Sequence, residues 1–84
     1  MVTVRLFGTL RLDSGVKALT AEAETVKELY PLVLKEIRAV KPDSAVTEKA
    51  LRRCLVAVNG IQAGARTKLR DGDVVCIFQA AAGG

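Results

Sequence analysis

One long helical pattern, set among short strand-like apolar runs, most constrains the fold of this chain. Over residues 26–40 the apolar side chains recur at the spacing of an amphipathic helix. The face that they form consists of Val26, Leu29, Val33, Ile37 and Val40, with Tyr30 and Leu34 beside it. Thr25 and Glu28 have the spacing of a capping box, which predicts the start of the helix. Pro31 lies inside the pattern and predicts a bend near residues 29–31.

The segments before and after this helix predict strands and one further short helix. Residues 2–8 alternate between apolar and polar side chains, as in a half-buried strand. Residues 9–13 are expected to continue this strand or to turn, and residues 16–23 to return as the second strand of a hairpin. After a break at Lys41-Pro42, we expect Ser44 or Asp43 to cap a short helix that ends at Arg53.

The last third of the chain predicts a second group of strands. Residues 54–58 form an apolar run, and Asn59-Gly60 is a strong signal for a tight hairpin turn. Residues 61–69 predict a short edge piece, residues 70–73 a turn and residues 74–78 a final strand. This order predicts an α+β fold of the β-grasp (ubiquitin-like) type. We expect a mixed sheet of four to five strands, the first and last paired in parallel at its centre, with one main helix packed across it.

Composition and charge exclude several classes of function. The 84 residues carry a net charge of +4, but the basic side chains are spread along the chain and only 4% of the residues are aromatic. A nucleic-acid-binding surface would gather basic and stacking side chains on one face, so we expect no nucleic acid partner. No apolar run is long enough to span a bilayer, and the first residues lack the apolar stretch of a signal peptide. We therefore expect a cytoplasmic protein with no membrane partner.

The sequence offers few residues for catalysis or metal binding. It contains no histidine, which excludes histidine acid–base chemistry and leaves too few ligands for a structural zinc site. Cys54 and Cys76 lie in apolar runs, so we expect reduced thiols packed in the core, with a disulfide or a sulfur-relay role for Cys76 as alternatives. Asp71-Gly72-Asp73 is interpreted as a turn, since the full ligand spacing of a calcium loop is missing. We expect neither a metal nor a bound cofactor.

The last six residues, Gln-Ala-Ala-Ala-Gly-Gly, follow directly on the final strand and contain no charged side chain. We divide the chain into a domain at residues 1–79 and a flexible C-terminal tail at residues 80–84. The tail is either a frayed end or a segment that enters a narrow slot and presents its terminal carboxylate. Gly83 and Gly84 carry no side chains that would obstruct such a slot. The residues alone leave both interpretations open.

In this order and spacing, the motifs resemble those of the small sulfur carrier proteins with a ubiquitin-like fold. This family includes the small subunit of molybdopterin synthase and the thiamine-pathway sulfur carrier. The resemblance covers essentially the whole chain, and its motifs lie at residues 4–11, 25–29, 56–60, 69–75 and 83–84. Residues 6–11 and the length of the chain resemble the molybdopterin branch. Phe78-Gln79 resembles the thiamine branch, in which the partner is a thiazole-forming enzyme.

The resemblance implies a carrier that is not itself an enzyme. A separate ubiquitin-activating-type enzyme would use ATP to adenylate the carboxylate of Gly84. A sulfur donor protein would then displace AMP and leave a thiocarboxylate on Gly84, which delivers sulfur for molybdopterin synthesis with the large catalytic subunit. The first alternative function is a sulfur carrier for thiamine or another sulfur-containing product. The second alternative is a ubiquitin-like modifier or a plain binding module.

Docking of this carrier requires exposed anchors on its globular body. Phe7 is opposite in phase to Val4 and Leu6, which should face the core, and Phe78 is the last residue before the tail. In the synthase branch, residues that match Phe7 and Phe78 meet the large subunit, so the resemblance supports both as anchors. Gly83, which has no side chain, would allow the tail to enter a narrow slot in the partner. The full set of predicted partner-binding residues is Phe7, Arg11, Ile61, Phe78, Ala80, Ala81 and Ala82.

Overall fold

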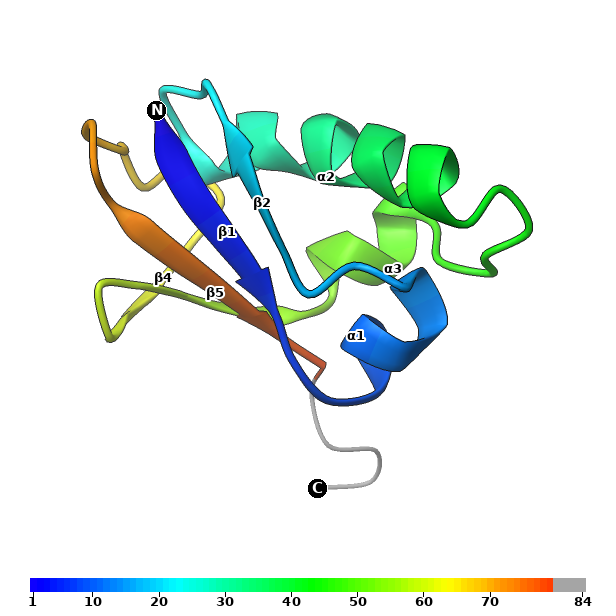
Figure 1. Cartoon of the computed structure of the whole chain (residues 1–84). Helices are drawn as coiled ribbons and strands as arrows, with labels where there is room; N and C mark the ends of the chain where they lie inside the picture. Colours follow the sequence, from blue (N-terminus) through cyan, green and yellow to red (C-terminus); the bar gives the residue numbers. More distant parts are fainter. Residues whose placement is uncertain (80–84) are drawn as a thin grey trace.

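Five strands form one mixed sheet in the computed structural model, which describes residues 1–79 of the chain (Figure 1). The strands are β1 (Val2–Leu6), β2 (Ala18–Ala21), β3 (Leu55–Val58), β4 (Ile61–Ala63) and β5 (Val74–Phe78), in the spatial order β2-β1-β5-β3-β4. β1 and β5 pair in parallel, whereas the other neighbours pair antiparallel. The sequence-based prediction of a β-grasp sheet with its first and last strands in parallel is confirmed.

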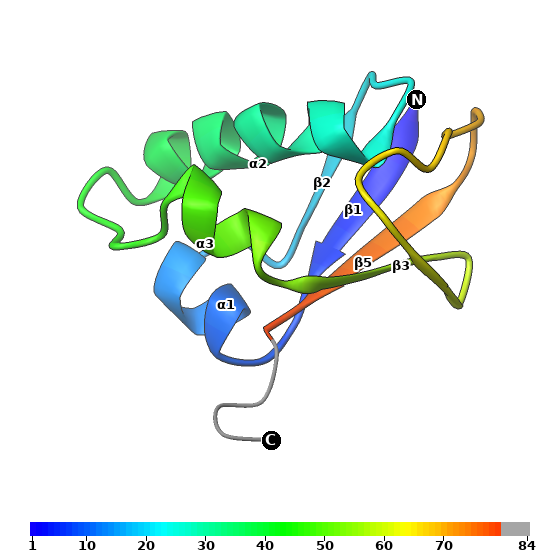
Figure 2. The ribbon, with the colours of Figure 1, turned by 180° about the vertical axis from the view of Figure 1, so that it is seen from behind.

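One long helix covers a single face of this sheet. α2 (Val26–Val40) crosses the sheet, and two short helices, α1 (Gly8–Ser14) and α3 (Glu48–Arg52), lie where β1 and β5 end (Figures 1 and 2). The core between sheet and helices consists mainly of aliphatic side chains. Its fully buried members include Val4, Leu6, Leu29, Val33, Ile37, Leu51, Val75 and Ile77. α2 runs without interruption through Pro31.

The predicted capping box at the start of α2 does not form. The Thr25 side chain accepts no hydrogen bond from the backbone of the first turn. The Oε1 atom of Glu28 reaches back, but it accepts from the backbone N–H of Glu24 at 3.1 Å. The first N–H groups of the helix therefore need other acceptors.

A loop distant in sequence supplies those acceptors. The backbone N–H of Val26 donates to the carbonyl of Thr67 at 3.0 Å, and that of Lys27 donates to the carbonyl of Ala65 at 2.9 Å. These carbonyls belong to the connection between β4 and β5. The start of α2 is thus fixed by tertiary contacts instead of by its own side chains.

α1 corrects the prediction for residues 9–13, which we expected to continue the first strand or to turn. Leu10 and Leu12 alternate as in a strand, yet they lie on a helix in which Leu10 is buried and Leu12 is 75% exposed. Gly15 ends α1 with a φ of 72° and donates its N–H to the carbonyl of Arg11 at 3.0 Å. Ser14-Gly15, which lies between the two segments of the expected hairpin, is therefore a helix C-terminus.

The cap of α3 also differs from the prediction. Thr47, not Ser44 or Asp43, precedes the helix, and its Oγ1 accepts from the backbone N–H of Ala50 at 3.1 Å. Ser44 has another function, because its buried hydroxyl donates to the carbonyl of Asp13 at 2.7 Å. This hydrogen bond ties the connection between α2 and α3 to the end of α1.

Asn59 and Gly60 form the predicted tight turn, with φ values of 51° and 84°. The side chain of Asn59 links this turn to the next one: its Nδ2 donates to Asp73 Oδ1, and its Oδ1 accepts from Val74 N, both at 2.9 Å. The other carboxylate oxygen of Asp73 accepts from the backbone N–H of Arg70 at 2.8 Å. These hydrogen bonds hold the pKa of Asp73 below its ordinary value. The bond from the Arg70 backbone has the larger effect, and the bond from the Asn59 side chain has the smaller one.

We expect this carboxylate to make stability depend on acid pH. Since its pKa is lower in the folded protein, the ionised group stabilises the fold above the ordinary pKa of aspartate, and the stabilisation is lost as the pH falls through the lowered value. In Asp73→Asn, the free energy of unfolding should therefore fall less steeply than in the wild type as the pH is lowered through the acid range. Urea denaturation at a series of pH values measures this dependence. Asp43→Asn, in an exposed connection, is the control. An acid limb identical to that of the wild type in Asp73→Asn would contradict this assignment.

Candidate functional site

The face of the sheet opposite α2 is open to solvent, and its residues follow from the register of the strands. Val4, Val75, Ile77 and Val56 point into the core, so their neighbours along each strand point outward. We call this surface the open face. Its members on the described strands are Thr3, Arg5, Ala18, Thr20, Leu55, Ala57, Gln62, Val74, Cys76 and Phe78.

A pair of stacked aromatic rings lies on the open face where the central strands end. Phe7 directly follows β1, and its ring centroid lies 5.0 Å from that of Phe78 at an interplanar angle of 15°. The N–H of Phe7 donates to the carbonyl of Ile77 at 3.2 Å and holds the two chain segments together. Phe7 is half-buried and Phe78 is 38% exposed, as expected for side chains outside the core. The structure thus brings together the two anchors proposed from the sequence.

Further apolar side chains extend this surface toward β3. Leu55, directly opposite Phe78 in the register, is 49% exposed. With Ala57 and Cys76 these residues line a shallow depression of about 340 Å³. Exposed apolar side chains that adjoin one another in this way are typical of a surface that binds another protein.

Arg5 is placed at the edge of the aromatic pair. Its guanidinium carbon lies 5.7 Å from the centroid of the Phe7 ring, within range of a cation–π contact. In the sequence, Arg5 is one of several basic residues spread along the chain. The alternation along β1 was the signal that could have placed it beside Phe7 on the outward side.

The two cysteines are free thiols in different surroundings. Cys76 is not a core residue as predicted: it pairs with Arg5 and Ala57 in the register and lies half-buried on the open face. Cys54 packs partly against the core, and its Sγ donates to the carbonyl of Ala50 at 3.3 Å. Burial raises the pKa of the Cys54 thiol, which disfavours the reactive thiolate.

Ile61 and Arg11 are not brought together with the aromatic pair on the open face. Ile61 pairs with Val58 and therefore lies on the opposite side of the sheet, at an edge where it is 74% exposed. Arg11 is exposed on α1. Their roles in partner binding stay predictions. The predicted sites at Ala80, Ala81, Ala82, Gly83 and Gly84 lie outside the described residues.

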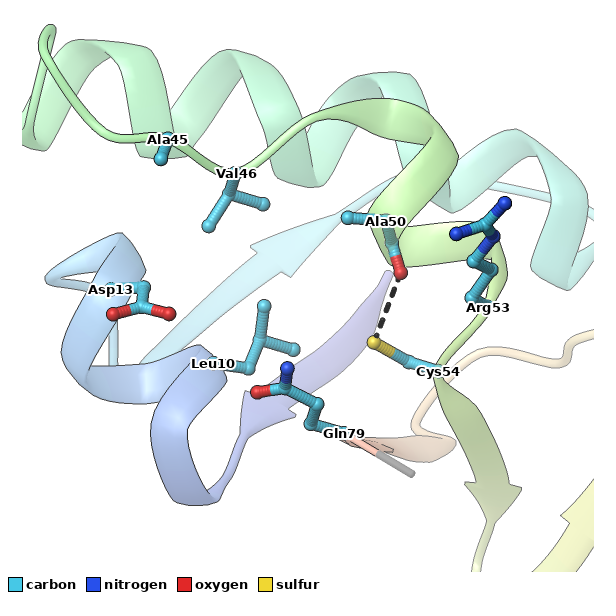
Figure 3. A pocket seen from close by; sticks show the side chains of 8 residues that line it. All are labelled: Leu10, Asp13, Ala45, Val46, Ala50, Arg53, Cys54 and Gln79. Atoms are coloured by element: carbon cyan, nitrogen blue, oxygen red, sulfur yellow. Dashed lines mark hydrogen bonds between the residues drawn. The ribbon is translucent and has the colours of Figure 1, made fainter. Parts of the chain in front are cut away.

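A groove that the sequence did not reveal lies beside Gln79, the last described residue (Figure 3). Its volume is about 320 Å³, and it lies between α1, the segment before α3, and α3 itself. The residues that line it are Leu10, Asp13, Ala45, Val46, Ala50, Arg53, Cys54 and Gln79. The hydroxyl of Thr9 donates to the Gln79 side-chain oxygen. This contact ties the end of the described chain to the first turn of α1.

Residues 1–79 contain neither a cluster of metal ligands nor a helix that is long and apolar enough to span a membrane. No cluster of three or more histidine, cysteine, aspartate or glutamate side chains is placed to hold a metal ion in this part of the chain. Likewise, none of the helices in residues 1–79 has the length and apolar character needed to cross a membrane.

Comparison with known proteins gives a consistent family relationship. The model of the ThiS family matches residues 4–84. No curated protein sequence matches the chain. Among solved structures, small archaeal modifier protein 1 from Methanosarcina acetivorans is 26% identical, with a TM-score of 0.73, and the match covers 99% of this chain and 95% of that protein.

Two further solved structures are complexes of two proteins. A chain in the complex of subunits 1 and 2 of molybdopterin-converting factor from Helicobacter pylori is 28% identical, with a TM-score of 0.59 and coverage of 99% of this chain and 97% of that chain. A chain in the BexX/CysO complex of Amycolatopsis orientalis is 30% identical, with a TM-score of 0.63 and complete coverage of both chains.

Proposed function

The chain belongs to the ThiS family of small ubiquitin-like sulfur carriers, and from this membership we propose that it is the sulfur-carrying small subunit of molybdopterin synthase. The observation that carries the proposal is the stacked pair of Phe7 and Phe78 on the open face, with only Gln79 between Phe78 and the tail. Such a pair gives a partner an aromatic anchor next to the segment that it must receive. The similarity to a chain of the Helicobacter pylori molybdopterin-converting factor complex supports this branch.

The proposed chemistry takes place on the backbone carboxylate of Gly84. On a separate adenylating enzyme, a carboxylate oxygen attacks the α-phosphorus of ATP, and pyrophosphate leaves. The outer sulfur of a persulfide on a donor protein then attacks the acyl carbon, AMP leaves and an acyl disulfide links Gly84 to the donor. A thiol next attacks the donor's own sulfur, forms a disulfide with it and releases Gly84 as the thiocarboxylate. The large catalytic subunit of the synthase takes the sulfur from this group. The use of ATP fits the cytoplasmic location expected from the sequence.

This chain contributes binding and positioning to the proposed reaction. A carboxylate is a poor electrophile until it is activated, and the activating groups belong to the adenylating enzyme. The carrier must dock firmly enough to offset the entropy lost when its tail is ordered. The open face supplies apolar area for docking, with Leu55 and Phe78 both partly exposed to a partner.

We expect Phe78→Ala to weaken binding to the adenylating enzyme by about 2 kcal/mol or more, roughly 30-fold, because a central aromatic anchor carries a large share of interface energy. Isothermal titration calorimetry with the adenylating enzyme of the source organism measures this loss. Val40→Ala removes an apolar side chain that is 52% exposed at the end of α2 and should bind like the wild type. Equal affinities for Phe78→Ala and the wild type would remove Phe78 from the interface.

Intact mass spectrometry tests the proposed function directly. The chain ending at Gly84 is incubated with the adenylating enzyme, ATP and a sulfur donor, and a mass increase that corresponds to one oxygen replaced by sulfur is expected. The product is then supplied to the large synthase subunit with its precursor, where sulfur should be consumed and the original mass restored. If Gly84 is converted to the thiocarboxylate but the large subunit does not remove its sulfur, the result would assign the protein to thiamine synthesis or another sulfur pathway.

A protein modifier is the second candidate function, because the chain is similar over nearly its whole length to small archaeal modifier protein 1. A modifier would join the Gly84 carboxyl to lysine amines of other proteins. Immunoblots of cells that express a tagged chain would then show conjugates of higher mass that resist reducing agents. A tagged chain that remains at its own mass during active sulfur transfer would exclude this candidate.

A further inference from the structure

The open face carries one sign of charge. Within the strands that the structure describes, Arg5 is the only charged member of the open face, and its other members are apolar or neutral polar side chains. No acidic side chain lies among them. The strands therefore give the face a single charge, the guanidinium of Arg5 on β1 beside the aromatic pair. On the β2 side, Glu36 of α2 adjoins the face and lines a hollow with Thr3, Ala18 and Thr20.

Arg5 has no charged or hydrogen-bonding partner among residues 1–79. Two other arginines in this part of the chain are paired: Arg38 donates to two backbone carbonyls at 2.6 and 2.7 Å, and Arg52 forms an ion pair with Glu48 at 3.0 Å. Arg5 instead extends over the ring of Phe7. Its five N–H donors are left to solvent or to a bound protein.

A partner that covers the aromatic pair must also cover Arg5. The guanidinium carbon is 5.7 Å from the Phe7 centroid, and the Phe7 centroid is 5.0 Å from that of Phe78, so the three side chains form one contiguous cluster. Removing a guanidinium from water without an acceptor is costly. The docked protein must therefore bring an acceptor to this position, and a carboxylate matches the forked donors of arginine.

We propose that the adenylating enzyme docks on the open face with an aspartate or glutamate carboxylate against Arg5, beside an apolar surface that receives Phe7 and Phe78. This inference rests on the proposed function and adds the chemistry of the surface that the partner presents. Phe78 is the member of this cluster next to the tail, and Arg5 lies two residues before Phe7 in the chain. Two unlike contacts at different points of the face fix how the partner is rotated relative to the tail, and the charge disfavours partners with a basic side chain beside Arg5.

The test compares Arg5→Glu with a control that makes the same change of charge elsewhere. The protein ending at Gly84 serves as substrate for the adenylating enzyme of the source organism in ATP–pyrophosphate exchange, and the KM for the carrier is measured at low and high salt. We expect Arg5→Glu to raise this KM by about tenfold or more with little change in kcat. Arg66→Glu alters an exposed residue in the connection between β4 and β5 and should leave the KM near the wild-type value.

Salt separates a charge contact from a packing defect. The wild-type KM should rise with salt, whereas the KM of Arg5→Glu should rise less or fall, since added salt screens the new repulsion. Equal KM values for wild type and Arg5→Glu, or equal losses in Arg5→Glu and Arg66→Glu, would overturn the inference while leaving the proposed function intact. A wild type that supports no exchange would overturn the proposed function and, with it, the inference.

Discussion

Deletion of Gly84 is expected to reduce adenylation and thiocarboxylate formation by more than about 100-fold without changing the stability of the domain. Removing one residue moves the terminal carboxylate back by about 3.5 Å along an extended chain. Reacting atoms must approach to about 3–3.5 Å, and a displacement of about 1 Å already costs about 100-fold in rate. ATP–pyrophosphate exchange and intact mass spectrometry measure the two steps.

Two further variants show whether the loss of activity comes from the shorter tail or from the identity of the last residue. Deletion of Ala81 keeps Gly83-Gly84 but shortens the tail equally, so it should lose activity as well. Gly84→Ala keeps the reach and adds one methyl group, so any loss reports how narrow the receiving slot is. The core residues all lie within residues 2–77, so thermal unfolding should be the same for all three variants and the wild type. Full activity after deletion of Gly84 would refute the proposed site.

Leu29→Ala should lower the free energy of unfolding by about 2–5 kcal/mol, the range for a buried leucine truncated to alanine. Leu29 is fully buried on the inner face of α2, where it packs in the core between helix and sheet. In a domain of this size the loss corresponds to a decrease of about 10 °C or more in the unfolding midpoint. Urea denaturation followed by circular dichroism measures it.

Leu12→Ala is the matched control, because it removes the same atoms from a side chain that is 75% exposed on α1. We expect a change within about 0.5 kcal/mol. In both variants the free energy of unfolding should fall with urea concentration at the wild-type slope, since neither substitution changes the surface exposed on unfolding by much. A similar loss in both leucine variants would mean that burial in the core is not what distinguishes them.

Local patterns in the sequence were sufficient for most elements of the sheet and for the main helix. The spacing of Leu29, Val33 and Ile37 reports which side of a helix meets a core, whatever that core consists of. Asn59-Gly60 predicted its turn because both residues tolerate a positive φ, which this turn requires. These signals lie within a few residues of each other and need no knowledge of distant neighbours.

Some errors arose where distant contacts outweighed local preference, and the error at Cys76 arose where a local pattern was not followed. Leu10 and Leu12 alternate as in a strand, but burial of Leu10 and the C-terminal Gly15 stabilise a helix there. The start of α2 depends on carbonyls of Ala65 and Thr67, about forty residues further along the chain, so the capping box was not needed. Cys76 was assigned to the core from its apolar surroundings, although alternation with the buried Val75 and Ile77 indicates the outward side.

The sequence by itself determined the family motifs, the β-grasp order of elements and Phe7 and Phe78 as candidate anchors, because motif spacing and periodicity are properties of the chain. Only the tertiary structure decided that the two rings stack, that the guanidinium of Arg5 lies over the Phe7 ring and that Ile61 lies on the other side of the sheet. Phe7 and Phe78 come from opposite ends of the described chain and meet through the parallel pairing of β1 and β5. Strand register sets such contacts, and register depends on how the whole core packs.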